Sequence, residues 1–393
     1  MSVTAAKGFA AAGVVAGLKT TGKKDLALVL NQGPHFSAGA VFTRNRVTAA
    51  PVIVSRAALA AAHAEDQPIH AIALNSGGAN ACTGQPGLAD ARDMAAAAAR
   101  VVGADASAVL VASTGLIGVP LAMEKVTGGI TAAAQDLAPT SEAGTAAAQA
   151  IMTTDTVHKE AQRSSGGITV GGMAKGAGML APQLATMLAV ITTDAVLSHD
   201  QAQRVIAQAC ATTFNRVDSD ACMSTNDTVM LMASGASGIE PDLDEITELV
   251  RQVAADLARQ LVADAEGASH DVHVIVTGAA SVPAAEAVAR EICRSALVKT
   301  AIFGNDPNWG RIVAAAGCVP EEIAPFNPDD LSVTINGIEV SRGGGVGEDR
   351  DQVDMSPREC EIIVDLGAGD ERADMWTNDL THEYVEENSA YSS

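Results

Sequence analysis

The residue with the most evident chemical potential is a threonine that follows an alanine behind a loop rich in glycine and proline. The stretch GGMAKGAGMLAPQLATMLAVITTDA runs from Gly171 to Ala195 and contains the pair Ala185–Thr186. A hydroxyl held against its own preceding carbonyl can attack it, move the acyl group from nitrogen to oxygen, and leave an ester that water hydrolyses. A small preceding residue and a loop that strains the peptide favour this self-cleavage. It would release the α-amine of Thr186, whose ordinary pKa of about 7.7–8.0 suits a base for the adjacent hydroxyl.

Two other interpretations of this stretch stay open on the pattern alone. A G-x-G-x-x-A sequence begins at Gly176 and Asp194 follows eighteen residues later, as in the dinucleotide-binding turn of an oxidoreductase. Pro182 counts against that turn, because it would lie inside the first turns of the helix that receives the pyrophosphate. Alternatively, the stretch is a glycine-rich loop that enters a core strand, and Thr186 is a half-buried hydroxyl without a catalytic role.

A second motif offers hydrogen-bond donors. The segment ASTGLIG covers residues 112–118 and follows a predicted strand. The negative oxygen of a tetrahedral acyl intermediate needs fixed donors, which the Thr114 hydroxyl and the Gly115 backbone N–H can supply. A tight turn after the strand would require the same glycine, so the motif alone indicates either a turn or an oxyanion site.

The elements around these motifs predict an α/β protein. Short β-rich runs alternate with longer helical patterns, and the alanine-rich stretch 88–102 is a predicted helix. The predicted strands are DLALVLN, PVIVS, IHAIALN, AVLVAST and MLAVITTDA.

Two capping signals begin predicted helices in the second half of the chain. Ser198 and Gln201 form a capping box, and Asp242 with Glu245 repeats the signal. The second of these helices is expected to end at Gly267. The apolar face of the first is predicted to consist of Ala202, Val205, Ile206, Ala209 and Cys210.

Composition and charge exclude several classes of partner. With 393 residues and 48% hydrophobic content, the chain can bury a large core without disulfides or metals. Residues 1–185 carry 13 Lys or Arg against 11 Asp or Glu, whereas residues 186–393 carry 12 against 36. The net charge of −22 argues against nucleic acid and anionic membranes as partners. We interpret the acidic half as a solubilising surface.

The cysteines and the apolar runs indicate a cytoplasmic protein. The six cysteines show no C-x-x-C pair and no zinc-ligand spacing, so reduced and mostly buried thiols are expected. The run GFAAAGVVAG after Lys7 contains three Gly and no Leu and is followed by basic residues, unlike a signal peptide. No apolar run has the length of a membrane span.

Many blocks of the sequence together resemble one family, the glutamate N-acetyltransferases or ornithine acetyltransferases of arginine biosynthesis. The resemblance covers essentially the whole chain, in order. It rests on VFTRN (41–45), NSGGANACTG (75–84), ASTGLIG (112–118), IMTTDT (151–156), KGAGMLAPQLATMLA (175–189), FNRVDSD (214–220), STNDTV (224–229), DAEGA (264–268), KTAIFGNDPNWGRI (299–312) and NSAYSS (388–393).

The resemblance implies a role for each matching residue. The threonine of the A-T-M-L block is the scissile position and the acetyl carrier, which corresponds to Thr186 behind Ala185. The S-T-G block forms the oxyanion hole, which corresponds to Thr114 and Gly115. The substrate contacts correspond to Thr153, Lys175, Thr186, Glu266, Asn388 and Ser393.

The chemistry of these residue types agrees with such roles, although each has a simpler explanation. Lys175 suits the carboxylate of an amino acid, but an isolated lysine is commonly a solvated surface charge. Glu266 falls at the predicted end of a helix, where the dipole tends to raise a carboxyl pKa and so favours proton transfer. A solvent-facing glutamate fits the same position. Asn388 and Ser393 lie in a tail that Trp376, Leu380, Tyr384 and Val385 are expected to dock.

The resemblance also implies a fold and a reaction. It predicts an αββα-type sandwich with a smaller C-terminal α/β domain, self-cleaved into interdigitating fragments 1–185 and 186–393. Acetyl would pass from N2-acetylornithine to Thr186 and then to glutamate. No cofactor or metal is expected, some members also accept acetyl-coenzyme A, and two copies of each fragment associate. An N-terminal-nucleophile amidase or peptidase of related fold is the alternative.

The chain departs from the family pattern at four positions, none with an assigned role. Gly78 stands where Asn is expected, Gln183 where Asn or Asp is commoner, Cys222 in an altered D-G-D-T run, and His270 where Lys is frequent.

Overall fold

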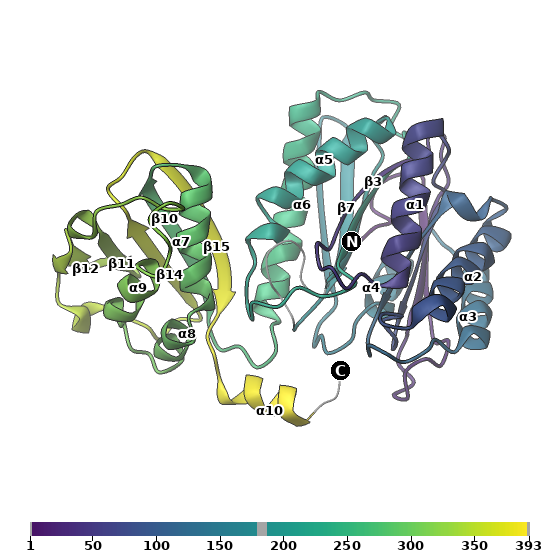
Figure 1. Cartoon of the computed structure of the whole chain (residues 1–393). Helices are drawn as coiled ribbons and strands as arrows, with labels where there is room; N and C mark the ends of the chain where they lie inside the picture. The colour runs from purple at the N-terminus through teal and green to yellow at the C-terminus, as the bar shows by residue number, and fades with distance from the viewer. Residues whose placement is uncertain (1, 179–186, 391–393) are drawn as a thin grey trace. The chain divides into compact units, whose positions relative to one another are not determined.

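The computed structural model describes residues 2–178 and 187–390 (Figure 1). They divide into two compact units. The larger unit comprises the described residues up to 215 together with 222–261, and the smaller unit comprises 216–221 and 262–390.

The first sheet of the larger unit, sheet A, has four strands in the order β1-β2-β4-β5. β1 pairs antiparallel with β2 and β2 with β4, whereas β4 and β5 are parallel. Its strands are β1 (Phe9–Val14), β2 (Leu26–Asn31), β4 (Ala71–Ser76) and β5 (Val109–Thr114).

The second sheet, sheet B, has five strands in the order β3-β9-β8-β7-β6. β8 and β9 are parallel, and the other neighbours are antiparallel. The expected cleavage position, Ala185–Thr186, lies outside the described residues, between β7 and β8. The strands are β3 (Ser37–Phe42), β6 (Lys159–Ser165), β7 (Ile168–Lys175), β8 (Leu188–Thr193) and β9 (Thr228–Ala233).

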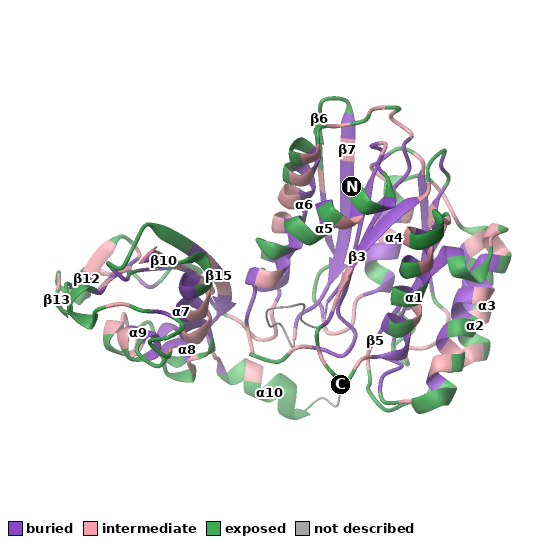
Figure 2. Cartoon of the chain, turned by 45° about the horizontal axis from the view of Figure 1, so that its top comes forward, coloured by how far each residue is buried: buried purple, intermediate pink, exposed green. Residues whose placement is uncertain are grey.

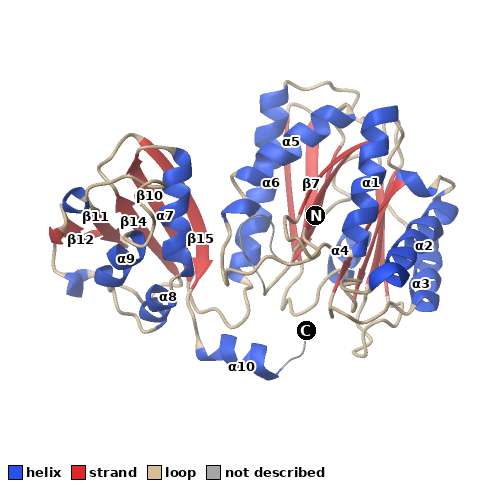
Figure 3. Ribbon diagram, in the orientation of Figure 1, coloured by secondary structure: helices blue, strands red, loops and turns tan. Residues whose placement is uncertain are grey.

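Helices cover the outer faces of both sheets, which confirms the αββα sandwich (Figure 3). α2 (Gly84–Val102) and α3 (Met123–Gln135) pack on the outer side chains of sheet A. α5 (His199–Ala211) and α6 (Leu243–Ala263) pack on sheet B, at glycines where a side chain would collide with the helices. The alternating inner side chains of both sheets share one core, and the strands other than the edge strand β6 are buried almost throughout (Figure 2).

Two further helices flank the edges of sheet A. α4 (Ser141–Ala150) packs against β1, and α1 (Ala50–Glu65) packs against β5. The Ser55 hydroxyl of α1 accepts the Val111 N–H (2.8 Å) and donates to the Val111 carbonyl (2.7 Å), which occupies the open edge of the strand. The prediction of a strand at PVIVS was therefore wrong. Pro51 lies in the first helical turn, where no N–H is needed, and the alanines that follow favour the helix.

The capping predictions hold, with one shifted boundary. Ser198 and Gln201 form the reciprocal capping box of α5, whose buried face is the predicted one. The Asp242 side chain accepts the N–H groups of Asp244 and Glu245 at the start of α6. α6 ends at Ala263, four residues before Gly267, so the predicted end of this helix was wrong. Gly267 instead adopts a left-handed conformation (φ 61°) in the turn beyond the helix.

The smaller unit is a separate α/β body, which confirms the expected C-terminal domain. Its six-stranded sheet has the order β13-β12-β11-β14-β10-β15. The strands are β10 (Asp271–Ala279), β11 (Ser332–Ile335), β12 (Ile338–Arg342), β13 (Gly345–Val346), β14 (Glu359–Asp365) and β15 (Glu371–Asn378). The helices are α7 (Val282–Arg294), α8 (Ala296–Phe303), α9 (Trp309–Ala316) and α10 (His382–Ala390). Short 3-10 turns in the two units are Ala106–Ala108, Phe214–Arg216, Pro328–Asp330 and Arg350–Gln352.

Candidate functional site

Two of the predicted site residues meet where strands of different sheets end. Lys175 is the last residue of β7 in sheet B, and Thr114 is the last residue of β5 in sheet A. The Lys175 Nζ donates to the Thr114 Oγ1 at 3.2 Å, and both residues are buried, with 1% and 2% of their surfaces exposed. An ammonium group only donates, so the Thr114 oxygen accepts here and its own proton stays available for another acceptor.

Gly115 has a conformation that other residues rarely adopt. Its φ is 126°, and an added Cβ would lie 2.6 Å from the backbone nitrogen of Gly78. The Thr114 carbonyl accepts the N–H groups of Gly77 (2.9 Å) and Gly78 (3.0 Å), which fixes the chain at this turn. A glycine is therefore required at this position. The two donors that the sequence suggested for an oxyanion, the Thr114 hydroxyl and the Gly115 N–H, lie at the end of β5, where the backbone is fixed.

Asp155, which the sequence analysis did not single out, connects the segments around these residues. Its Oδ2 accepts the Thr153 N–H (2.9 Å), and its Oδ1 accepts the Gly176 N–H (2.6 Å). Lys159 donates to the same Oδ1 from its Nζ at 2.7 Å. One buried carboxylate thus holds the backbone at Thr153 and directly after Lys175, two expected substrate contacts.

The charges around Asp155 decide its ionisation. Burial alone would raise its pKa, but the ammonium groups of Lys175 and Lys159, with the Gly176 N–H, lower the pKa to about 2. Asp155 is therefore a carboxylate at neutral pH, and it balances positive charge that would otherwise be buried alone.

A third ammonium group, that of Lys19, lies near this network. Burial is the main reason that the pKa of Lys19 falls to about 8, against an opposing effect of Asp25, and the nearby charge of Lys175 lowers it further. The Lys19 Nζ donates to the Lys24 carbonyl at 2.8 Å. Sequence reasoning missed Lys19, because it lies in a basic loop that resembles an ordinary solvated surface.

Another buried carboxyl group, that of Asp227, lies just before β9 and was also missed. It accepts the N–H groups of Met187 and Ser224, each at 3.1 Å. Burial raises the pKa of Asp227 well above its usual range, although these N–H groups and the charge of Lys175 oppose the rise. The STNDTV block contained the only sequence signal, a run of polar residues immediately before a strand.

The structure brings together two further predicted residues within the smaller unit. The Asn388 Nδ2 of α10 donates to the Glu266 Oε2 at 3.0 Å. Glu266 lies in the turn three residues after α6 ends rather than at the helix terminus that the sequence suggested. Thr186, Ala185 and Ser393 lie outside the described residues.

The C-terminal helix is attached through polar contacts more than through the apolar side chains expected to dock it. The Thr381 hydroxyl donates to the Gly267 carbonyl at 2.7 Å and accepts the Tyr384 N–H at 2.9 Å. Trp376 belongs to β15 and stacks on His273, whereas Val385 is 57% exposed. The prediction that Val385 helps to bury the tail was therefore wrong.

The departures from the family pattern have local explanations at two positions. A Cβ at Gly78 would lie 2.8 Å from the Leu121 side chain, so the glycine accommodates Leu121. His270 is buried and contacts Asp379 Oδ2 (3.0 Å) and the Met355 carbonyl (3.2 Å), a role that a lysine would not fill alike. Cys222 is exposed, and Gln183 is outside the described residues.

The strand directions argue against a dinucleotide-binding turn at Gly176. That turn requires a βαβ unit with parallel strands, whereas β7 and β8 on either side of this segment pair antiparallel. Asp194 is buried and accepts the N–H groups of Thr169 (2.8 Å) and Lys7 (3.3 Å), so it does not present a carboxylate to a ribose.

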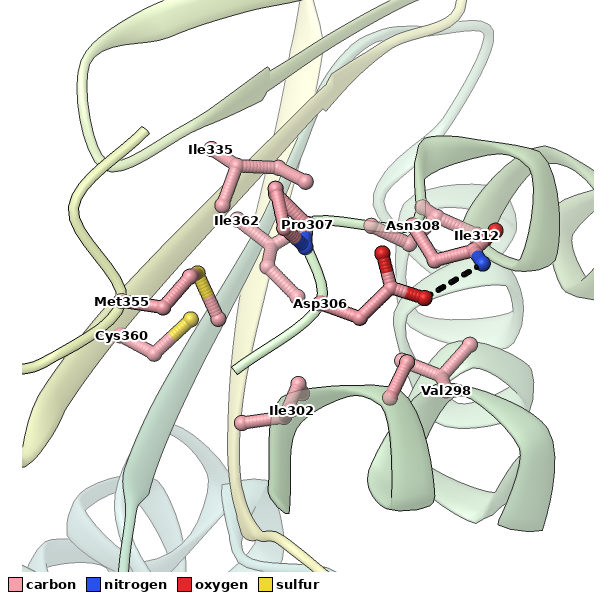
Figure 4. Close-up of a pocket in the computed structure, with 11 residues that line it drawn as sticks. Val298, Ile302, Asp306, Pro307, Asn308, Ile312, Ile335, Met355, Cys360 and Ile362 are labelled. Carbon is pink, nitrogen blue, oxygen red and sulfur yellow. Dashed lines mark hydrogen bonds between the residues drawn. The ribbon is translucent and has the colours of Figure 1, made fainter. Parts of the chain in front are cut away.

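A small pocket in the smaller unit contains none of the predicted site residues (Figure 4). It measures about 210 Å³ including its solvent-facing part. Its carboxylate, Asp306, accepts a hydrogen bond from the Asn308 Nδ2 at 2.8 Å. Burial raises the pKa of the Cys360 thiol on its wall to about 12, so this thiol is a poor nucleophile.

The described part of the chain contains no group of three or more His, Cys, Asp or Glu residues that could hold a metal ion. None of the helices within residues 2–178 and 187–390 combines the length and apolar character needed to cross a membrane.

The expectation of mostly buried cysteines was only half right. Cys210, Cys293 and Cys360 are buried, but Cys82, Cys222 and Cys318 are exposed.

Comparison with known proteins gives a consistent result. A family model described as the ArgJ family matches residues 10–393. The arginine biosynthesis bifunctional protein ArgJ of Bifidobacterium longum is 54% identical over 396 residues, with 100% of both chains covered. The protein of the same description from Streptomyces coelicolor is 56% identical over 393 residues, again with full coverage. A crystal structure of ornithine acetyltransferase complexed with ornithine, from Mycobacterium tuberculosis, is 45% identical with a TM-score of 0.43, covering 48% of this chain and 96% of that chain.

Proposed function

Because the chain belongs to the ArgJ family and is an acetyltransferase of arginine biosynthesis, we propose that it transfers acetyl from N2-acetylornithine to glutamate through Thr186. The observation that best supports this site is the buried contact between Lys175 and Thr114. The Thr114 hydroxyl lies next to the left-handed turn at Gly115. The Lys175 ammonium comes from the end of β7, the strand that precedes the Thr186 segment.

The proposed activation is a self-cleavage before Thr186. The Thr186 Oγ attacks the carbonyl carbon of Ala185, the peptide C–N bond breaks, and the nitrogen takes the hydroxyl proton. Water then hydrolyses the resulting ester and regenerates the hydroxyl. The products are fragments 1–185 and 186–393, and the second begins with a free α-amine next to its own hydroxyl.

The proposed transfer has two half-reactions. The Thr186 Oγ attacks the acetyl carbonyl of N2-acetylornithine, the Thr114 hydroxyl and the Gly115 N–H stabilise the oxyanion, and ornithine leaves after its nitrogen gains a proton. The amine of glutamate then attacks the acetyl ester, loses a proton, and departs as N-acetylglutamate. Glu266 is proposed for the proton transfers because the family resemblance implies that role, and its Oε2 accepts a hydrogen bond from Asn388.

The remaining proposed roles concern binding. Lys175 and Thr153, whose backbone neighbourhood Asp155 fixes, are proposed to contact the amino-acid part of the substrate. Ser393 is proposed as a further contact. No cofactor is required, because the donor is itself an amide of similar energy to the product. We include acetyl-coenzyme A as a second donor, because the named relatives are described as bifunctional. Two copies of each fragment are proposed to associate in the cytoplasm.

Denaturing mass spectrometry with an activity assay tests the proposal. The wild type should give two fragments, the second beginning at Thr186, and should form N-acetylglutamate from acetylornithine and glutamate. Thr186→Ala should give one intact chain without transfer. Thr193→Ala is the matched control, because it removes a buried hydroxyl from the other end of β8 and should leave cleavage intact.

Three results would overturn parts of the proposal. An active wild type with an uncut chain would exclude the cleavage mechanism. Hydrolysis of acetylornithine without N-acetylglutamate would indicate an amidase. N-acetylglutamate formed from acetylornithine but not from acetyl-coenzyme A would remove the second donor.

A further inference from the structure

The Asn226 side chain holds the strand end that leads to the oxyanion donors. Its Nδ2 donates to the carbonyls of Ala79 (2.6 Å) and Ser113 (2.8 Å), and its Oδ1 accepts the Thr225 hydroxyl (2.6 Å). The Ser113 carbonyl belongs to the peptide unit that begins Thr114. Asn226 is buried, so these bonds do not exchange readily with water.

The next residue, Asp227, holds the chain that follows Thr186. Its Oδ1 accepts the Met187 N–H at 3.1 Å, while the Met187 carbonyl accepts the Thr228 N–H at 3.1 Å. The nitrogen of Met187 is covalently bonded to the carbonyl carbon of Thr186. Met187 is therefore fixed on both of its backbone groups, one bond away from the residue proposed to carry acetyl.

Among the described strands, the two that adjoin these places belong to different sheets. Thr114 ends β5 in sheet A, whereas Met187 precedes β8 in sheet B, and the two sheets meet through packed side chains. The consecutive residues Asn226 and Asp227, whose Cα atoms are about 3.8 Å apart, hydrogen-bond to both. The loop that carries them is itself held, because the Ser224 N–H donates to Asp227 and the Ser224 carbonyl accepts the Thr43 hydroxyl.

We propose that Asn226 and Asp227 are positioning residues that set the spacing between Met187, the residue bonded to the proposed nucleophile Thr186, and the Thr114–Gly115 oxyanion site. This inference rests on the proposed function, since it assigns no role apart from that reaction. Attack on a carbonyl needs the nucleophile at the carbon and the oxyanion donors at the oxygen of the same group at the same time. A displacement of about 1 Å between them costs roughly 10²-fold in rate. The pair acts through the backbone and does not touch the substrate.

The test compares Asn226→Ala and Asp227→Asn with Asn31→Ala. Asn31 is a matched control, because its buried Nδ2 also donates to two carbonyls, His35 (3.0 Å) and Ala233 (3.1 Å), at the opposite end of β9. For each variant, mass spectrometry measures the cleaved fraction, and kcat and KM are determined per cleaved molecule. Thermal unfolding checks that each variant is folded at the assay temperature.

We expect both site variants to cleave more slowly than the wild type and to lose roughly 10²-fold in kcat, with the KM for acetylornithine unchanged. Asn31→Ala should lose thermal stability without losing kcat. Equal loss of kcat in all three variants, or loss of folding in Asn226→Ala and Asp227→Asn but not in Asn31→Ala, would assign a structural role only and overturn the inference. Failure of the proposed function itself would be separate, because the wild type would then form no N-acetylglutamate.

Discussion

Asp155 and Asp227 hold the two ends of the segment that contains the proposed cleavage position, but they do so by different physical means. Asp155 accepts the N–H of Gly176 after β7, and Asp227 accepts the N–H of Met187 before β8. Asp155 also pairs with the Lys159 ammonium, which helps to lower its pKa to about 2. Around Asp227 the described contacts are mainly N–H groups, and burial raises its pKa.

This difference separates two sources of rigidity. At Asp155 a buried charge is balanced by an opposite charge, so removal of one partner leaves the other without compensation. At Asp227 dipoles hold the carboxyl group, and a neutral side chain of the same shape can retain part of the arrangement. We therefore expect Asp155 to contribute more than Asp227 to the free energy of unfolding. Asp227 should affect the rate of the reaction more than the stability of the protein.

The largest effect is expected from Asp155→Ala. It leaves Lys159 buried without its carboxylate and should lower the free energy of unfolding by about 3–5 kcal/mol, as measured by urea denaturation. Adding Lys159→Met to this variant removes the stranded charge and should restore part of the loss. A loss below about 1 kcal/mol in the single variant would show that the ion pair is not what holds this end.

The next effect concerns acid. Because the pKa of Asp155 is about 2 in the folded protein and 3.8 ordinarily, its contribution is complete above about pH 4 and is lost as the pH falls towards 2. This contribution amounts to about 2 kcal/mol. Urea denaturation from pH 5 to pH 3 should show a steeper loss for the wild type than for Asp155→Asn. Parallel profiles would contradict the charge balance at Asp155.

Asp227→Asn should show the opposite dependence on pH with a smaller amplitude. The raised pKa means that the folded protein holds the proton more tightly, so the contribution is greatest in acid and declines as the pH rises through the folded pKa. At pH 5 the variant should be less stable than the wild type by about 1 kcal/mol, and this difference should shrink towards pH 9. A difference that grows with pH would mean that Asp227 is held as an anion.

The smallest effect is expected at an exposed carboxylate. Hydrogen bonds from Arg251 and Gln252 lower the pKa of Glu248 to about 2, similar to Asp155, but its side chain is 50% exposed. Solvent screens this pair, so Glu248→Gln should change the free energy of unfolding by less than about 0.5 kcal/mol. A cost comparable to that of Asp155→Ala would show that burial does not explain the comparison.

The local patterns of the sequence predicted an α/β protein and several of its elements, whereas the sandwich was implied by the family resemblance. Alternation of β-branched runs with helical stretches correctly located β2, β4, β5 and β8, and Ser198 with Gln201 marked the start of α5. The run PVIVS misled, because three β-branched residues outweighed a proline that suits a helix start. Glu266 was assigned to a helix end because a glycine such as Gly267 commonly stops a helix. In the structure the helix ends at Ala263, and Gly267 lies in the turn beyond it.

The carboxyl groups of Asp155 and Asp227 beside the candidate site could not be predicted, because their partners are distant along the chain. Asp155 bonds to Gly176, 21 residues away, and Asp227 bonds to Met187, 40 residues away. Such pairs depend on which strands become neighbours in sheet B, and no periodicity in a single sequence encodes that order. The family blocks contained both residues without indicating what they hold.

The strand order of sheet B has a consequence for a cleaved chain. β8 and β9 lie between β7 and β3, so the proposed fragment 186–393 would supply the two strands in the middle of a sheet whose remaining strands come from 1–185. Before cleavage, refolding from urea is a first-order process within one molecule. After cleavage the two fragments must find each other, so recovery would depend on protein concentration as it does for a heterodimer. Under this mechanism the enzyme would fold as a single chain before cleavage. After cleavage and unfolding, neither fragment could restore sheet B without the other.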